Sequence, residues 1–443
     1  MARWRAPALE NLISLIGEYG DVVPLPDFGV PFFMFNHPDQ IEEILRRKHF
    51  FFKKACFLEA LRPLLGDGLF TSDGETWRRH RMLAQPLFAA RQIQQHAPAM
   101  VESAERMTSG WQDGETRDFH ADMMRLTLEI VIKTLFDVEV NDIGTLGEEL
   151  DAATNYYAHP RSVWSSSGTS ATATNAPSGH STQRLDALIF AMIRERHESG
   201  VGHRTDLLSR LLLAEDENGC KMSAAELRDQ LVTHFIAGQE TTALTLSFAF
   251  CLLSQNPDAE SALHAELDRV LGGRLPTADD VAELHYAESV IKESMRIFPP
   301  VWAVGREALD DCEIGGHRVP KGAQVLMAQF AVHRDPRFWC DPERFNPSRW
   351  DEECTKNLPR CAYFPFGDGP RACIGANLAM MEAVLLLATI AQRYRLESAQ
   401  GQILYLVPSM TLRPRDGIKM SVRQHCRTTR PAGPQQLPVQ TGT

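Results

Sequence analysis

Cys373 is the side chain whose surroundings in this sequence point most clearly to chemistry. It lies in the segment 364–375, FPFGDGPRACIG, where two glycines and two prolines precede it and restrict the backbone. A helix is expected to begin at about Gly375, and the positive end of a helix with its free N–H groups favours a thiolate. Glycines also let the backbone approach a sulfur atom and a flat ligand closely. An isolated cysteine beside a tight turn is more often a buried structural residue, so this segment leaves both interpretations open.

A polar interruption, AGQETT at 237–242, divides the longest apolar stretch of the chain, 224–255. A glycine inside a helix costs ~1 kcal/mol relative to alanine, and a buried acid costs more unless it is hydrogen-bonded. A hydroxyl group can also bond its own backbone and loosen the helix locally. Taken alone, the interruption would be a helix kink with a capped acid.

Charged and aromatic side chains recur at helical spacing elsewhere. Glu293 and Arg296 are three residues apart on a predicted helix and share a face. Taken alone they would be a solvated surface pair. Trp77 and Arg81 are about one helical turn apart, so both could reach one ligand.

The segment around Cys373 resembles the haem-binding signature of the cytochrome P-450 family. That signature is Phe, two residues, Gly, one residue, Arg or His, one residue, Cys, one residue, Gly. Five residues of this chain fill its fixed positions, and Ala379 fits the small position that follows: Phe366, Gly369, Arg371, Cys373 and Gly375. The resemblance implies that Cys373 is the axial ligand of the iron of haem b, iron protoporphyrin IX, and that Phe366, Gly367 and Gly375 contact the haem. A thiolate ligand favours cleavage of the O–O bond.

The interruption at 237–242 is similar to the family's motif (Ala/Gly)-Gly-x-(Asp/Glu)-Thr. The resemblance implies that the groove at Ala237 and Gly238 receives dioxygen. Thr241 would hold the oxygen and an ordered water, and Glu240 would relay protons from solvent as a general acid.

Four further residues match the family's ligands for the haem propionates: Trp77, Arg81, Arg306 and Arg371. Haem carries two carboxylates, so several buried or half-buried cations are expected around it. For Arg78 and Arg79 we expect ordinary solvent exposure.

Glu293 and Arg296 look like the family's Glu-x-x-Arg helix, whose third partner is an arginine in a proline-flanked meander before the cysteine. Arg344 and Arg349 both qualify by position. The longer family pattern fits 342–350 and selects Arg349, with Trp350 where phenylalanine is usual. This triad would be structural and would fix the loop that presents the thiolate.

Composition narrows the functional class. The chain has 443 residues, 44% apolar and 23% charged, as in globular proteins, and a net charge of −11 that argues against nucleic-acid binding. Acidic residues interrupt the N-terminal stretch far short of the ~20 apolar residues of a membrane span, and no signal peptide is visible. We therefore expect a cytoplasmic protein without a membrane anchor. None of the nine cysteines makes a CxxC pair, which gives no support to a zinc-ribbon or thioredoxin-like fold.

The sequence predicts one mainly helical domain over 1–443, because it contains no clear interdomain linker. The family resemblance extends from about 20 to 422, and it implies a triangular helical prism with small β-sheets, with haem between the long central helix and the helix after the cysteine loop. Periodicity predicts helices at 123–138, from Leu185 onward, at 224–255 and at 375–394. We expect a closing hairpin at 408–422, a disordered tail at about 424–443, and a mobile loop at Ser162–Thr182. This loop lies where the resembled family has a mobile lid, which implies control of access to the pocket.

The resemblance implies a monooxygenase that inserts one oxygen atom from O2 into a hydrophobic molecule such as a terpenoid, fatty acid or polyketide. Five segments would form the pocket, with walls at Phe57, Leu61, Leu64, Phe235, Val301, Trp302, Val304 and Met410. The sequence shows no flavin or nicotinamide motif, so electrons from NAD(P)H would arrive through a ferredoxin or flavodoxin and its reductase. We expect a monomer. Rival interpretations are a peroxygenase or lipid-peroxide isomerase, which usually lacks the acid–alcohol pair, and a haem-based sensor, which usually carries an output domain.

Overall fold

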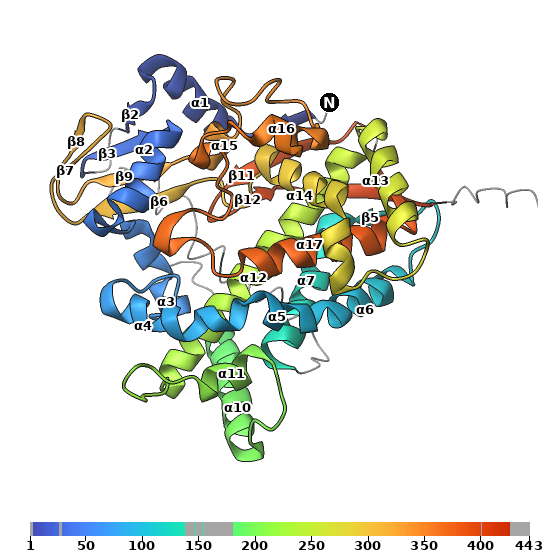
Figure 1. Cartoon of the computed structure of the whole chain (residues 1–443), viewed down its shortest axis with the longest axis horizontal. Helices are drawn as coiled ribbons and strands as arrows, with labels where there is room; N and C mark the ends of the chain where they lie inside the picture. Colours follow the sequence, from blue (N-terminus) through green and yellow to red (C-terminus); the bar gives the residue numbers. More distant parts are fainter. Residues whose placement is uncertain are drawn as a thin grey trace, which may run out of the picture.

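The computed structural model describes residues 3–25, 29–137, 147, 154, 180–399 and 401–425. Figure 1 shows a mainly helical body in which a five-stranded sheet lies at one end and most of the long helices lie at the other. The fold is mainly α with small sheets, as predicted. Most of the loop predicted at Ser162–Thr182 and residues 426–443 of the predicted tail lie outside the described residues.

The α-helices have the following bounds: α1 Pro7–Tyr19, α2 Pro38–Glu42, α3 Arg62–Leu65, α4 Gly74–Ala84, α5 Ala90–Ile93, α6 Ala97–Thr108, α7 Phe119–Phe136, α10 His180–Ser199, α11 Leu207–Leu213, α12 Ala224–Leu253, α13 Pro257–Val270, α14 His285–Ile297, α15 Gln329–Val332, α16 Glu352–Thr355 and α17 Ala376–Ala391. Three short helical turns also matter for the site: η1 Glu43–Arg47, η7 Pro347–Trp350 and η9 Gly369–Arg371.

The strands form four sheets among the described residues: β2-β3-β9-β6-β4, β1-β11-β12, β10-β13-β5 and β7-β8. Their bounds are β1 Arg3–Arg5, β2 Val22–Pro24, β3 Phe32–Phe35, β4 Phe52–Lys54, β5 Thr116–Asp118, β6 Val304–Ala308, β7 Cys312–Ile314, β8 His317–Val319, β9 Gln324–Met327, β10 Tyr394–Ser398, β11 Ile403–Pro408, β12 Leu412–Pro414 and β13 Lys419–Gln424.

Helix α12 is the central element and runs through the middle of the molecule (Figure 1). A capping box begins it, because the Ser223 side chain accepts from the Glu226 N–H and the Glu226 carboxylate accepts from the Ser223 N–H. It is long and apolar enough to cross a membrane, but 83% of its most apolar 18-residue window is buried inside the protein. It packs against α7, α14 and α17, which surround it.

The chain packs on this core from its first described residue, although the sequence predicted an ordered core only from about residue 20. The ring of Trp4 on β1 lies 6.2 Å from the ring of Phe298 and 5.7 Å from the ring of Phe330. On α1, Leu9 and Leu12 are buried. The apolar side of α1 is short, but its buried residues hold the helix against the core.

The predicted closing hairpin at 408–422 is wrong. Strand β12 pairs antiparallel with β11, whereas β13 pairs with β10 and β5 in a different sheet. Near Gly417 (φ +69°) the chain turns toward Asp118, whose carboxylate accepts from the Ile418 N–H at 3.3 Å. Alternate residues of β13, Met420 and Val422, are then buried. This burial stabilises the pairing with β10 over a local hairpin.

Helix α17 contains a buried carboxyl group that provides a test of this packing. Glu382 is 4% exposed, its Oε1 has no hydrogen-bond partner among the described residues, and burial raises its pKa to about 8. An unfolded glutamate titrates near 4.5. The folded state should therefore lose stability as the pH rises from about 4.5 to about 8, because burial opposes ionisation only in the folded protein.

We predict that Glu382→Gln removes most of this pH dependence. Each unit of pKa shift corresponds to about 1.4 kcal/mol, so the free energy of unfolding at about pH 8.5 should increase by a few kcal/mol. Denaturant unfolding at about pH 5.5 and about pH 8.5 measures the effect, with Glu352→Gln on the exposed face of α16 as the control. An unchanged pH dependence in Glu382→Gln would show that this carboxyl group is not the source.

Candidate functional site

The loop that carries Cys373 is a tight turn pressed against the rest of the protein. The Cys373 N–H donates to the Phe366 carbonyl at 2.8 Å, and the Gly367 N–H donates to the Phe364 carbonyl at 2.9 Å. Gly369 has φ +72°, and a Cβ atom there would lie 1.9 Å from the Leu45 carbonyl oxygen of η1. Only glycine fits this position, so the motif's glycine is required by close approach of two backbones.

The thiol of Cys373 is accessible, in contrast to the buried Cys361 thiol nearby in the chain. Burial by surrounding protein raises the pKa of the Cys373 thiol, while the Gly375 N–H and the Arg81 guanidinium act in the opposite direction. The helix start therefore favours the thiolate less than the sequence suggested. A metal cation would supply the remaining stabilisation of the thiolate.

Cations gather beside this loop without enough anions to balance them. Asp73 accepts from the main-chain N–H of Lys54 at 3.0 Å and from Nη2 of Arg371 at 2.9 Å. The Lys54 ammonium group donates to the Leu69 and Ser72 carbonyls. Arg306 is 8% exposed and donates from Nη1 to the Gly305 carbonyl at 2.8 Å. Burial lowers the pKa of Lys54 to about 7 and that of Arg306 to about 10.

These groups fit a ligand with two carboxylates. Three cations (Lys54, Arg306 and Arg371) face a single acid in this cluster, and Nε of Arg371 is buried without a hydrogen-bond partner among the described residues. Uncompensated buried charge is costly, and two propionates would relieve it. The residues present therefore fit haem.

Lys54 is a member of this cluster that the sequence did not reveal. Its register on β4, directly opposite Arg306 on β6, places it there. A lysine at the end of a short strand has no distinctive local pattern. Only the pairing of β4 with β6 would have pointed to it.

Trp77 and Arg81 on α4 also lie at the Cys373 loop. The Arg371 Cζ atom is 5.1 Å from the centre of the Trp77 ring, and Arg81 Nη1 donates to the Ala372 carbonyl at 2.8 Å. Arg78 is exposed, as expected, but the expectation for Arg79 is wrong. Arg79 is half-buried and forms ion pairs of 2.6 Å with both Asp216 and Glu226, which anchor α4 to the segment before α12 and to the first turn of α12.

On α12, Ala237 and Thr241 lie one turn apart on an accessible side of the helix. The Ala237 side chain is exposed, and the Thr241 hydroxyl donates to the Ala237 carbonyl at 2.8 Å. Gly238, expected to help form the oxygen groove, also lies against α7. A Cβ atom there would lie 3.2 Å from Cγ2 of Val131, so this glycine lets α7 pack closely against α12.

Glu240 is buried and engaged from β12. The Thr411 hydroxyl donates to Glu240 Oε1 at 2.8 Å, and the Arg413 guanidinium forms an ion pair with the same oxygen. The acid next to Thr241 in sequence is thus held by residues about 170 positions later. No local pattern in the sequence indicates these partners.

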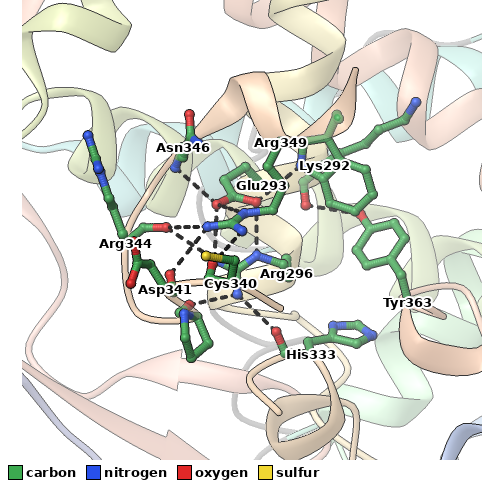
Figure 2. Close-up of polar contacts among 12 residues, drawn as sticks. Lys292, Glu293, Arg296, His333, Cys340, Asp341, Arg344, Asn346, Arg349 and Tyr363 are labelled. Carbon is green, nitrogen blue, oxygen red and sulfur yellow. Dashed lines mark hydrogen bonds and ion pairs between the residues drawn. The ribbon is translucent and has the colours of Figure 1, made fainter. Parts of the chain in front are cut away.

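The predicted triad is assembled around Glu293, whose side chain has no exposure (Figure 2). Arg296 donates to both carboxylate oxygens at 2.9 Å, and Arg349 Nε donates to Oε1 at 3.0 Å. Arg344 contributes only its carbonyl, which accepts from Arg296 and Arg349. The choice of Arg349 over Arg344 is confirmed.

Trp350, the departure from the family pattern, also joins this centre. Its indole N–H donates to Glu293 Oε2 at 3.1 Å, which a phenylalanine could not do. The Asn346 N–H adds a bond of 3.0 Å to Oε1. The buried carboxylate is therefore fully satisfied.

A chain of contacts leads from this triad to the cysteine loop. Arg296 Nη1 donates to the His333 carbonyl at 2.9 Å, and the His333 ring accepts from the Phe364 N–H at 3.0 Å (Figure 2 labels His333). Gln329 then donates to the Phe364 carbonyl at 3.1 Å. Phe364 begins the loop that ends at Cys373, so the triad fixes the base of that loop.

The proposed pocket walls divide into two groups. Leu61, Leu64 and Phe235 are buried in the core that joins α3, α7 and α12. Trp302 is buried as well, and its indole N–H donates to the Ser409 carbonyl at 2.7 Å. Four are half-buried and stay candidates for substrate contact: Phe57, Val301, Val304 and Met410.

We predict that Cys373 alone ligates the haem iron. The ferrous carbon-monoxide complex should show the strongly red-shifted Soret band of a thiolate ligand, and Cys373→His should abolish it. Cys361→Ser and Cys354→Ser are the controls and should keep the band. Loss of the band in either control, with its retention in Cys373→Ser, would move the ligand elsewhere.

We predict that Arg349→Ala yields little haem-loaded protein and that Arg344→Ala is tolerated. Removing one partner of a buried ion pair typically costs about 3–5 kcal/mol, because the remaining charge is left uncompensated. Haem content per polypeptide and thermal unfolding measure the difference. Equal behaviour of the two variants would contradict the role assigned to Arg349.

Known proteins resemble this chain over nearly its whole length. Residues 4–422 match the family model described as Cytochrome P450. Cyclooctat-9-en-7-ol 5-monooxygenase of Streptomyces melanosporofaciens is 36% identical over 91% of this chain and 88% of its own, and pentalenene oxygenase of Streptomyces avermitilis is 30% identical over 87% and 86%. The crystal structure of the cytochrome P450DA heme domain superimposes with a TM-score of 0.85 at 29% identity, covering 94% of this chain and 93% of that one. With a family model that matches it almost from end to end and a solved haem domain that shares its fold, the chain belongs to the cytochrome P450 family.

Proposed function

We propose that this P450 monooxygenase oxidises a terpenoid of fused rings, with Glu240 and Thr241 delivering protons and a separate ferredoxin or flavodoxin delivering electrons. The names of its relatives support the substrate class, since one acts on cyclooctat-9-en-7-ol and another on pentalenene. The half-buried apolar side chains of Val301, Val304 and Met410 suit such a molecule.

One observation carries the proposal: an accessible cysteine thiol lies next to an unbalanced group of buried and half-buried cations. Arg371 connects the two, since it precedes Cys373 by two residues and pairs with Asp73. On the thiol side, the Arg81 guanidinium bonds the Ala372 carbonyl and acts electrostatically on Cys373. Lys54, Arg306 and Arg371 would hold the haem carboxylates, with Trp77 packed against Arg371. Bound there, haem supplies the reduction and cleavage of dioxygen that side chains cannot perform.

The protein's own residues would then manage protons and water. The Thr241 hydroxyl, now bonded to the Ala237 carbonyl at 2.8 Å, can turn to hold a water molecule at the accessible side of α12. Glu240 would supply the proton as a general acid. The apolar walls exclude bulk water, which strengthens these hydrogen bonds.

Electron supply is the second part of the proposal. The family resemblance implies electron supply from a redox protein. We assign electron delivery to a ferredoxin or flavodoxin, reduced in turn by an NAD(P)H-dependent reductase in the cytoplasm. Reconstitution with each carrier class measures which one supports turnover.

We predict that Thr241→Ala binds haem and substrate normally but wastes electrons. Consumption of reduced cofactor should continue, while most electrons appear as hydrogen peroxide, because protons no longer arrive in the right order. Product formed per reductant consumed is the decisive measurement. Thr242→Ala, which removes a buried hydroxyl from the same helix, is the control for packing. An unchanged ratio in Thr241→Ala would favour a peroxygenase or isomerase.

A further inference from the structure

The partners of Glu240 come from one strand of the sheet β1-β11-β12. Thr411 immediately precedes β12, and Arg413 lies within it. The Thr411 hydroxyl donates to Glu240 Oε1 at 2.8 Å, and Arg413 forms an ion pair with the same oxygen. Arg413 Nε also donates to the Thr411 hydroxyl oxygen at 3.3 Å. The three side chains form a closed triangle.

The backbone that presents Thr411 and Arg413 is fixed. The Thr411 carbonyl accepts from the Ser409 N–H at 3.0 Å, and the Leu412 N–H donates to the Pro300 carbonyl at 2.8 Å. Arg413 pairs with Val407 of β11 in antiparallel register. Both side chains therefore project toward α12 from a rigid frame.

Exposure differs across the triangle. Thr411 is buried, the Glu240 side chain is 7% exposed, and the Arg413 side chain is 17% exposed. Arg413 is thus the member nearest to solvent.

The other titratable group that faces Glu240 is His120 of α7. Burial lowers the pKa of His120 to about 4, although Glu240 and Asp118 act to raise it, so it is uncharged at neutral pH. Its ring nitrogen Nδ1 lies 3.1 Å from the Ser247 hydroxyl. Among the described residues around Glu240, the positive charge at neutral pH is therefore that of Arg413.

We propose that Thr411 and Arg413 are positioning residues for Glu240, holding its carboxylate turned toward β12. The inference deepens the proposed function and rests on it. To act as a general acid, the Glu240 carboxyl group takes a proton from water at the Arg413 edge and turns toward Thr241. It gives that proton to a water molecule held by the Thr241 hydroxyl and then returns to Arg413.

The first experiment measures the bonding of the Glu240 carboxyl group in the holoenzyme without turnover. Infrared difference spectra between each protein and its Glu240→Gln counterpart isolate the Glu240 band. Arg413→Gln and Thr411→Val should each shift the frequency of this band, because each variant removes a partner of the same carboxylate oxygen. Arg415→Gln is the matched control, because Arg415 lies two residues away, pairs with Asp416, and stacks on Tyr405 at 4.3 Å.

The second experiment measures product per reductant consumed. Arg413→Gln should lower this ratio about tenfold, less than the roughly hundredfold or more that general acid catalysis contributes, because Glu240 itself is kept, and the thiolate Soret band should be unchanged. Arg413→Lys should restore much of it. Thr411→Val keeps the charge and removes one hydrogen bond, so it tests the positioning role even if Arg413→Gln fails to fold.

The outcomes distinguish a failure of this inference from a failure of the proposed function on which it rests. If Glu240→Gln and Thr241→Ala form as much product per reductant consumed as the wild type, the proposed function fails, whatever the infrared spectra show. If Glu240→Gln is uncoupled but Arg413→Gln and Thr411→Val match Arg415→Gln in both measurements, the positioning role is overturned and the function stands.

Discussion

The ion-pair network around the Glu293 carboxylate is the interaction on which the rest of this structure depends. A charge with no solvent exposure is tolerated only if hydrogen bonds replace its hydration, and here Arg296, Arg349, Trp350 and the Asn346 N–H do so. These donors come from α14 and from the meander at η7, so satisfying one carboxylate fixes two segments together. The contact then reaches the cysteine loop through His333.

A second constraint is charge that the polypeptide leaves unbalanced. Lys54, Arg306 and Arg371 are brought together by strand pairing and by the loop at η9, with Asp73 as their shared anion. Burial lowers the pKa of Lys54 and of Arg306, which means that the folded protein disfavours the charged forms of these two side chains. The two carboxylates of a cofactor bound here would balance these positive charges, so cofactor binding and folding would stabilise each other.

Sequence reasoning succeeded where motif spacing alone fixes geometry. The residues of the Cys373 loop, the Glu293–Arg296 helix and the Ala237–Thr241 turn lie where local spacing predicted, since each depends on helical or turn periodicity. It failed for Lys54, Arg79 and the end of the chain. Their partners are more than a hundred residues away in the sequence or depend on which strand pairs with which, as for β13 with β10. Such contacts follow from tertiary packing and leave no local pattern.

Glu240 and Thr241 show that two side chains adjacent in the sequence need not act at the same place. Successive residues of an α-helix project about 100° apart, so Glu240 and Thr241 cannot face the same neighbour. Thr241 bonds the carbonyl of the accessible Ala237, whereas Glu240 is held by Thr411 and Arg413 on β12. Proton transfer between them therefore requires a rotation of the carboxylate or an intervening water. The residues at β12 that hold Glu240 therefore control when it can give up a proton. No pattern confined to α12 could have indicated this control.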